Sequence, residues 1–111
     1  PYAYLGIGDV LDISNPTTPV LVGSFTSQAT VSHMSLYGNT LYVPRYEKGL
    51  STMDLTTDPT HPTLTFTYPT RGYAMSVERL GDFVYVANGY GGLLVLGAFA
   101  NHPVYLPLVR R

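Results

Sequence analysis

Short apolar runs separated by turn residues follow one another along the whole chain. None of them shows the 3.6-residue period of an amphipathic helix, and most have the length of a strand. Residues 31–37 form one run and residues 40–43 the next, with Gly38-Asn39 between them. Two-residue turns of this kind need positive φ angles and therefore select Gly, Asn and Asp. The pattern predicts β-hairpins and an all-β fold.

The pattern also repeats with a period of 43 residues. MSLYGNTLYV (34–43) aligns without a gap with VERLGDFVYV (77–86), and the prolines of NPTTP (15–19) recur at the same offset in DPTHP (58–62). Asn15 or Asp58 can bond the backbone just ahead, and the first proline of each pair fixes φ for the turn. The proline pair therefore predicts a corner that the chain turns twice.

Each copy of the repeat is predicted to form four strands. The third run is residues 49–55 or 92–99, and the fourth is residues 63–68, matched upstream by 20–25. A four-stranded antiparallel unit that recurs at this spacing fits the roughly 40 to 45 residues of a β-propeller blade. Blades stack face to face, which covers both faces of a middle strand and allows apolar residues at consecutive positions. The sequence thus predicts antiparallel four-stranded blades of a β-propeller.

The phase of the repeat predicts how much of a ring the chain contains. Residues 1–27 supply a partial blade, residues 28–70 a complete blade, and residues 71–111 a terminal degenerate blade with its last strand near residues 104–109. This amounts to about two and a half blades, whereas a closed ring needs at least about four. We expect an unclosed part of a longer protein, completed by further blades of the same polypeptide or by oligomerisation.

Composition agrees with buried sheet faces and narrows the classes of partner. Charged residues are 12% of the chain, about half of the usual share of roughly 25%. The net charge of −1, with no run of either sign, argues against nucleic acid as a partner. The absence of cysteine excludes disulfides and thiol catalysis. No apolar run approaches the length of a membrane span.

The segments GYAMSVERLGDFVYVANGYGGLLVL (72–96) and VLDISNPTTPVLVGSF (10–25) resemble the LVIVD-repeat proteins. The repeat of that family joins a Gly-Tyr-Ala start, a Gly-Asn/Asp hairpin, a Tyr-Val-Ala strand, a Gly-Leu-x-Val strand and an Asp-Val-Ser-Asn-Pro corner. The resemblance covers nearly the whole chain and implies a bacterial or archaeal protein that is secreted or displayed on the cell surface. It implies no catalytic motif and no cofactor.

Two copies depart from the pattern of the repeat. The first runs from Tyr4 to Asp12, a shorter connection than Tyr42 to Asp54 in the second. In the third, Gly97 stands where Asp54 would be, and FANHP replaces the corner, as expected of a degenerate terminal repeat.

Successive turns of an antiparallel meander lie at opposite ends of a blade. Loops 45–48 and 88–91 should therefore share one end, here called the upper loop face, with the linkers 26–30 and 69–73. Functional loops of rigid scaffolds gather at such faces. Tyrosine and arginine are frequent in interaction hot spots, so this face predicts a site for a protein or glycan partner. The alternative is a solvated loop with one ion pair. The candidate binding residues are Arg45, Tyr46, Glu47, Arg71 and Tyr73.

Three other patterns favour structural roles. A phosphate loop would need a helix after the glycines of NGYGG (88–92), but a strand pattern follows, so a hairpin turn is favoured. Asp12 and Asp54 recur at one strand position and should accept local backbone N–H bonds. His33 falls alone in an apolar strand, and His61 and His102 precede prolines in surface corners. None has a second ligand at a metal-like spacing. We expect no catalytic residue, metal or cofactor.

The favoured interpretation is a non-catalytic propeller segment that acts as a scaffold or as a protein or glycan interaction module. The first alternative is part of a propeller enzyme of hydrolase or lactonase type, with its active site mostly outside this chain; this rests on fold analogy. The second is a purely structural spacer. An inward cluster of carboxylate, His or Asn side chains from several blades would favour the enzyme.

Overall fold

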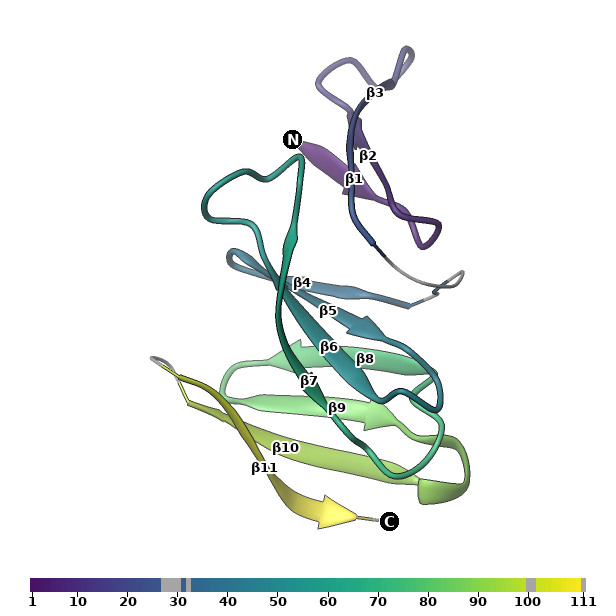
Figure 1. The fold of residues 1–111 in the computed structure, drawn as a ribbon, viewed down its shortest axis with the longest axis vertical. Coiled ribbons are helices and arrows are strands. Elements are labelled where there is room, and N and C mark those ends of the chain that lie inside the picture. Colours follow the sequence, from purple (N-terminus) through teal and green to yellow (C-terminus); the bar gives the residue numbers. More distant parts are fainter. Residues whose placement is uncertain (27–30, 32, 100–101, 111) are drawn as a thin grey trace.

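Three antiparallel β-sheets stacked along the long axis make up the molecule (Figure 1). This computed structural model describes residues 1–26, 31, 33–99 and 102–110. These residues contain eleven strands and one 3₁₀ turn, η1 (Gly89–Gly91), but no α-helix. The predicted all-β fold of antiparallel blades is therefore confirmed, and the three sheets do not close a ring.

We call the three sheets blades 1, 2 and 3, in chain order. Each is a simple meander in which neighbouring strands are also consecutive in sequence. Blade 1 contains β1 (Tyr2–Tyr4), β2 (Asp9–Asp12) and β3 (Val20–Ser24). Blade 2 contains β4 (Ser35–Tyr37), β5 (Thr40–Pro44), β6 (Leu50–Asp54) and β7 (Thr63–Tyr68). Blade 3 contains β8 (Ser76–Leu80), β9 (Phe83–Ala87), β10 (Leu93–Phe99) and β11 (His102–Arg110).

The strand register shows the same unit three times. Tyr4 pairs with Val10 in blade 1, as Tyr42 pairs with Thr52 in blade 2. Each blade also has an irregularity between its last two strands at the equivalent point: after Val10, after Thr52 and after Val95. A bulge of this kind bends the strand and increases its twist. The repeat in sequence is thus a repeat in backbone geometry.

Blades meet through apolar faces. We call the side of a blade that contacts the next blade its forward face, and the side that contacts the previous blade its backward face. Two clusters of side chains fill the two contacts. The cluster between blades 1 and 2 contains Tyr4, Val10, Val22, Leu41, Val43 and Met53. The cluster between blades 2 and 3 contains Tyr42, Leu50, Val77, Val84, Val86, Leu94 and Leu96.

Burial along the strands shows which blade is enclosed. Four consecutive residues of β5 and four of β6 are buried, because blade 2 has a neighbour on both sides. In β9, Val84 and Val86 are buried but their neighbours are not. The consecutive apolar residues of β9 are therefore covered on the backward face alone.

Polar contacts and one glycine fix how the blades approach each other. The hydroxyl of Tyr4 donates to the carbonyl of Pro59 at 2.8 Å, and Nη1 of Arg79 donates to the hydroxyl of Tyr42 at 2.6 Å. A Cβ at Gly23 would collide with the backbone carbonyl of Thr60. Blade 1 therefore lies directly against the proline corner of blade 2.

The structure corrects two details of the sequence prediction. His33 does not lie in an apolar strand: β4 starts only at Ser35, and His33 is exposed with a φ of 58°. The reason is that the chain turns at His33 before it enters β4. The NGYGG segment does join two antiparallel strands, as predicted, but through η1 and not through a two-residue turn.

Candidate binding face

The upper loop face begins with the tight loop between β5 and β6. The amide of Arg45 donates to the carbonyl of Gly49 at 2.8 Å, and the amide of Gly49 donates back to the carbonyl of Tyr46 at 3.0 Å. Tyr46 adopts a φ of 54°, which is uncommon for a residue with a Cβ. The loop therefore presents Tyr46 at its turning point.

A backbone bridge ties this loop to the linker that leads into blade 3. Tyr46 and Ala74 exchange two hydrogen bonds, of 2.9 and 3.0 Å. The rings of Tyr46 and Tyr73 lie 5.0 Å apart at an angle of 44°, a favourable tilted geometry. Two of the five candidate residues are thus in direct contact.

The linker is held from its other side by Asn88, which is fully buried. Its carbonyl accepts from the amide of Tyr73 at 3.0 Å, and its Nδ2 donates to the carbonyl of Thr70 at 2.7 Å. Gly72 lies so close to Asn88 that a Cβ there would reach its Nδ2 at 2.6 Å. Loops 45–48 and 88–91 therefore enclose linker 69–73. Of the first linker, residues 27–30 lie outside the described residues.

The other three candidates differ in placement. Arg71 is exposed, with a φ of 57°. Glu47 is exposed at the tip of its loop. Arg45 is half-buried, and its Nη1 donates to Oγ of Ser51 in β6 at 3.1 Å. The face therefore presents Glu47, Arg71 and Tyr73 outward, whereas Arg45 and Tyr46 are half-buried.

Backbone strain gathers at this end of the molecule. The non-glycine residues with positive φ are His33, Tyr46 and Arg71, in the part of the chain that the structure describes. Such conformations cost on the order of 1 to 3 kcal/mol each and concentrate at functional sites. Tyr46 lies in the loop between β5 and β6, whereas the other two lie in or beside the linkers that enter β4 and β8. The strain thus supports a functional interpretation of this face.

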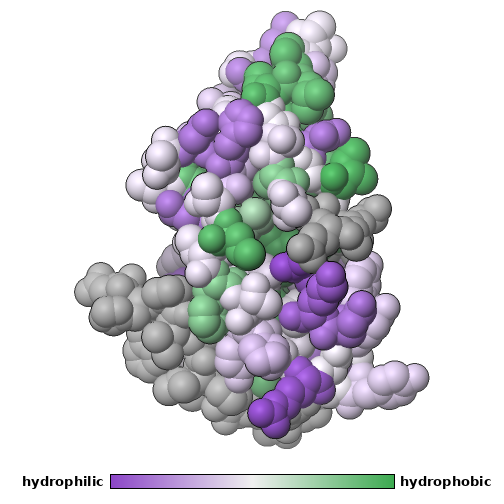
Figure 2. Space-filling view, in the orientation of Figure 1, coloured by the Kyte–Doolittle hydropathy of each residue, from purple (hydrophilic) through white to green (hydrophobic). Residues whose placement is uncertain are grey.

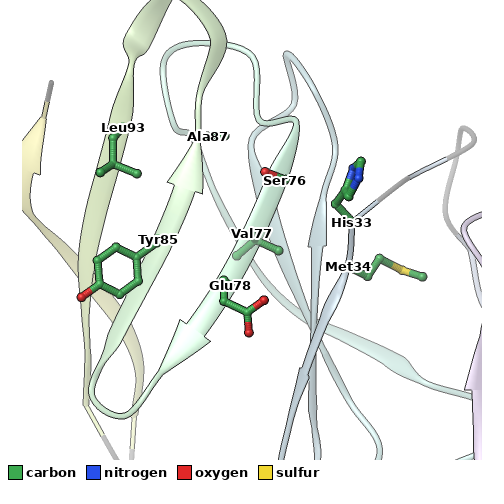
Figure 3. Close-up of a pocket in the computed structure, with 8 residues that line it drawn as sticks. All are labelled: His33, Met34, Ser76, Val77, Glu78, Tyr85, Ala87 and Leu93. Atoms are coloured by element: carbon green, nitrogen blue, oxygen red, sulfur yellow. The ribbon is translucent and has the colours of Figure 1, made fainter.

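Two hollows adjoin the upper loop face. One, of about 270 Å³, is lined by His33, Tyr46, Met75, Ser76 and Ala87. The other, of about 390 Å³, shares three of these residues and extends down blade 3 along Glu78, Tyr85 and Leu93 (Figure 3). The sequence did not lead us to assign His33, Met75 or Ser76 to this face. His33 and Ser76 occupy the same position in consecutive repeats, so the 43-residue offset could have linked these two residues.

The recurring carboxylates both form local hydrogen bonds at the end of their strand, but the predicted bond from a backbone N–H is present only at Asp12. Oδ1 of Asp12 accepts from the amide and hydroxyl of Ser14, and Oδ1 of Asp54 accepts from the hydroxyl of Thr56. The Ser14 hydrogen bonds hold the pKa of Asp12 below its ordinary value. The hydrogen bonds of Thr60 do the same for the pKa of Asp58, which also contacts His61 at 3.1 Å.

The described residues offer neither a metal-binding cluster nor a helix that could span a membrane. They contain no group of three or more His, Asp or Glu side chains that could hold a metal ion. None of their helical segments is long and apolar enough to cross a membrane.

The chain matches a family profile in each of its three blades. The LVIVD repeat profile matches residues 1–27, 30–70 and 71–96, one match for each blade. Neither the curated proteins nor the solved structures gave a match.

Proposed function

The chain belongs to the LVIVD repeat family, and on that premise we propose that this β-propeller-like module is a non-catalytic interaction module of a secreted or cell-surface protein. Its upper loop face binds a protein or glycan partner. The observation that carries the proposal is the contact between Tyr46 and Tyr73, two aromatic rings held together by a backbone bridge.

The chemistry of the face suits binding. Tyrosine offers a large apolar surface with a polar tip at low conformational cost, and arginine adds directional hydrogen bonds. Tyr73 is 44% exposed and Met75 48% exposed, so both retain surface for a partner. These contacts form an aromatic surface and not a converging set of acid and base groups. We therefore propose binding rather than catalysis for this face.

The test is a binding screen against a glycan array and a panel of extracellular proteins, followed by titration of each ligand found. Tyr46→Ala with Tyr73→Ala should weaken binding about tenfold or more. Arg71→Gly should also weaken it, and glycine is chosen because it adopts positive φ without steric cost. Circular dichroism checks that each variant folds.

Tyr2→Ala is the matched control, because Tyr2 is similarly exposed (38%) but lies in blade 1. It should bind like the wild type. Unchanged binding in the Tyr46/Tyr73 double variant and in Arg71→Gly would refute the assignment of this face.

A further inference from the structure

The position of Tyr46 is filled by glycine one repeat later. Gly89 lies 43 residues further along the chain, and its φ of 58° matches the 54° of Tyr46. The two loops also share a hydrogen bond: the amide of Gly92 donates to the carbonyl of Gly89 at 3.0 Å, and that of Gly49 donates to Tyr46 at 3.0 Å. Glycine adopts this conformation without steric cost, whereas a residue with a Cβ is strained. Blade 2 therefore forms with a strained residue the loop that blade 3 forms with an unstrained one.

The bridge from this loop to the next linker also forms without an aromatic side chain. In blade 1, the amide of Val31 donates to the carbonyl of Gly6 at 3.0 Å. The equivalent bond of blade 2, from the amide of Ala74 to the carbonyl of Tyr46, has the same length. One repeat before Tyr73, the sequence has an alanine. The contact between the two tyrosine rings is therefore an addition to the repeat and not a requirement of its fold.

Tyr73 is confined from two sides. Its ring lies 5.0 Å from that of Tyr46, and a Cβ built on Gly89 would come within 2.8 Å of the Tyr73 Cβ. Tyr46 is half-buried, whereas Tyr73 is 44% exposed. On the side where Figure 1 places the β5–β6 loop and η1, Figure 2 shows mainly hydrophilic and intermediate surface. The exposed ring of Tyr73 can therefore meet a partner, and the ring of Tyr46 limits how it can turn.

We propose that Tyr46 is a positioning residue: it strains its own loop and holds the exposed ring of Tyr73 in the orientation that binds a partner. This inference rests on the function proposed above and places the aromatic contact with the partner at the junction of blades 2 and 3. A ring that is already held loses less conformational freedom on binding than a mobile ring. Strained backbone is concentrated at active sites and ligand-binding segments, and the other repeats form the same contacts without it.

The strain is tested by two substitutions that both remove the ring. Tyr46→Gly relieves the positive φ, whereas Tyr46→Ala keeps a Cβ, so the glycine variant should unfold at a higher urea concentration. Lys48 is the matched control in the same loop, because it is exposed and is not among the residues with positive φ. There the order should reverse, with Lys48→Ala more stable than Lys48→Gly. A Tyr46→Ala variant as stable as Tyr46→Gly would overturn the proposal.

Positioning is tested by NMR spectroscopy of the Tyr73 side chain, which needs no ligand. The couplings between its Hα and Hβ protons should report one χ1 rotamer in the wild type and in Tyr46→Phe, because both keep a ring against it. Tyr46→Gly should show averaged couplings, while the amide shifts of β5 and β6 report an intact blade 2. A single Tyr73 rotamer in Tyr46→Gly would overturn the proposal without affecting the proposed function of the face.

Affinity for each glycan or protein that the screen identifies gives the functional readout. Tyr46→Gly should bind about tenfold more weakly than the wild type, even though it is more stable than Tyr46→Ala. Tyr46→Phe should recover most of the affinity, because it restores the ring. If Tyr73→Ala weakens binding but Tyr46→Gly does not, the positioning role is overturned and the function of the face stands. If neither variant weakens binding, the proposed function fails as well.

Discussion

The side chain of Arg79 contacts two tyrosines across the boundary between blades 2 and 3. Its Nη1 donates to the Tyr42 hydroxyl at 2.6 Å, and its guanidinium lies 4.2 Å from the centre of the Tyr37 ring. A planar cation can stack and donate at once, which lysine cannot reproduce. The side chain thus orients two blades that apolar packing alone would hold less specifically.

Replacement of Arg79 should weaken this boundary. We expect Arg79→Ala to lower the free energy of unfolding by about 1 to 2 kcal/mol, measured by urea denaturation. Arg79→Lys should lie between that variant and the wild type. In a double-mutant cycle with Tyr42→Phe the two losses should not add, because each variant removes the same hydrogen bond. Additive losses would contradict the coupling.

The two proline corners, residues 15–19 and 58–62, contain no strand pairing. Hydrogen bonds with side chains hold their backbone instead. Oδ1 of Asn15 accepts from the amide of Thr17 at 3.2 Å, and Oδ1 of Asp58 accepts from the amide of Thr60 at 3.0 Å. Both corners therefore have one geometry, in which the side chain acts as part of the turn. In blade 2 this geometry depends on an ionised carboxylate.

Acid should loosen the corners. The pKa of Asp12 and of Asp58 is lowered in the folded state by hydrogen bonds from Ser14 and Thr60. A lowered folded pKa gives stability that is present above the unfolded value of about 4 and lost as the pH falls below it. Urea midpoints should decline below that pH. The Asp12→Asn/Asp58→Asn variant should decline less, and equal declines would rule out this origin.

The turn before β4 and the linker 69–73 show which features could not be predicted from the sequence. The apolar runs and proline pairs were sufficient to locate the strands; β7, for example, has the predicted bounds of 63–68. His33 was misplaced because its apolar neighbours continue the strand pattern while its backbone turns. The pairing of Tyr46 with Tyr73 depends on packing between blades, which no local pattern encodes.

At the scale of the whole molecule, blade 2 contributes side chains to both apolar clusters. Leu41 belongs to one and Tyr42 to the other, on opposite faces of the same strand. Each blade contacts its immediate neighbours, as in other repeat proteins, so stability is approximately a sum of unit and boundary contributions. A change at one boundary should therefore leave the other intact.

Gly23→Val tests this independence. The added side chain would collide with the backbone of Thr60 and separate blade 1 from blade 2. Amide hydrogen exchange should accelerate in β1–β3 while β8–β10 stay protected. Ser24→Val, an exposed position in the same strand, should change neither. Faster exchange in β8–β10 of the glycine variant would show instead that the chain opens as one unit.

The irregularity between the last two strands of every blade affects how the outer edge of each sheet can pair with other polypeptide chains. A straight, flat edge strand can pair with an edge strand of another molecule and so start a fibril. A bend at a fixed point of the strand disrupts that pairing. Because the bend recurs in all three blades, edge-to-edge pairing with another sheet is disfavoured at the outer strand of each blade.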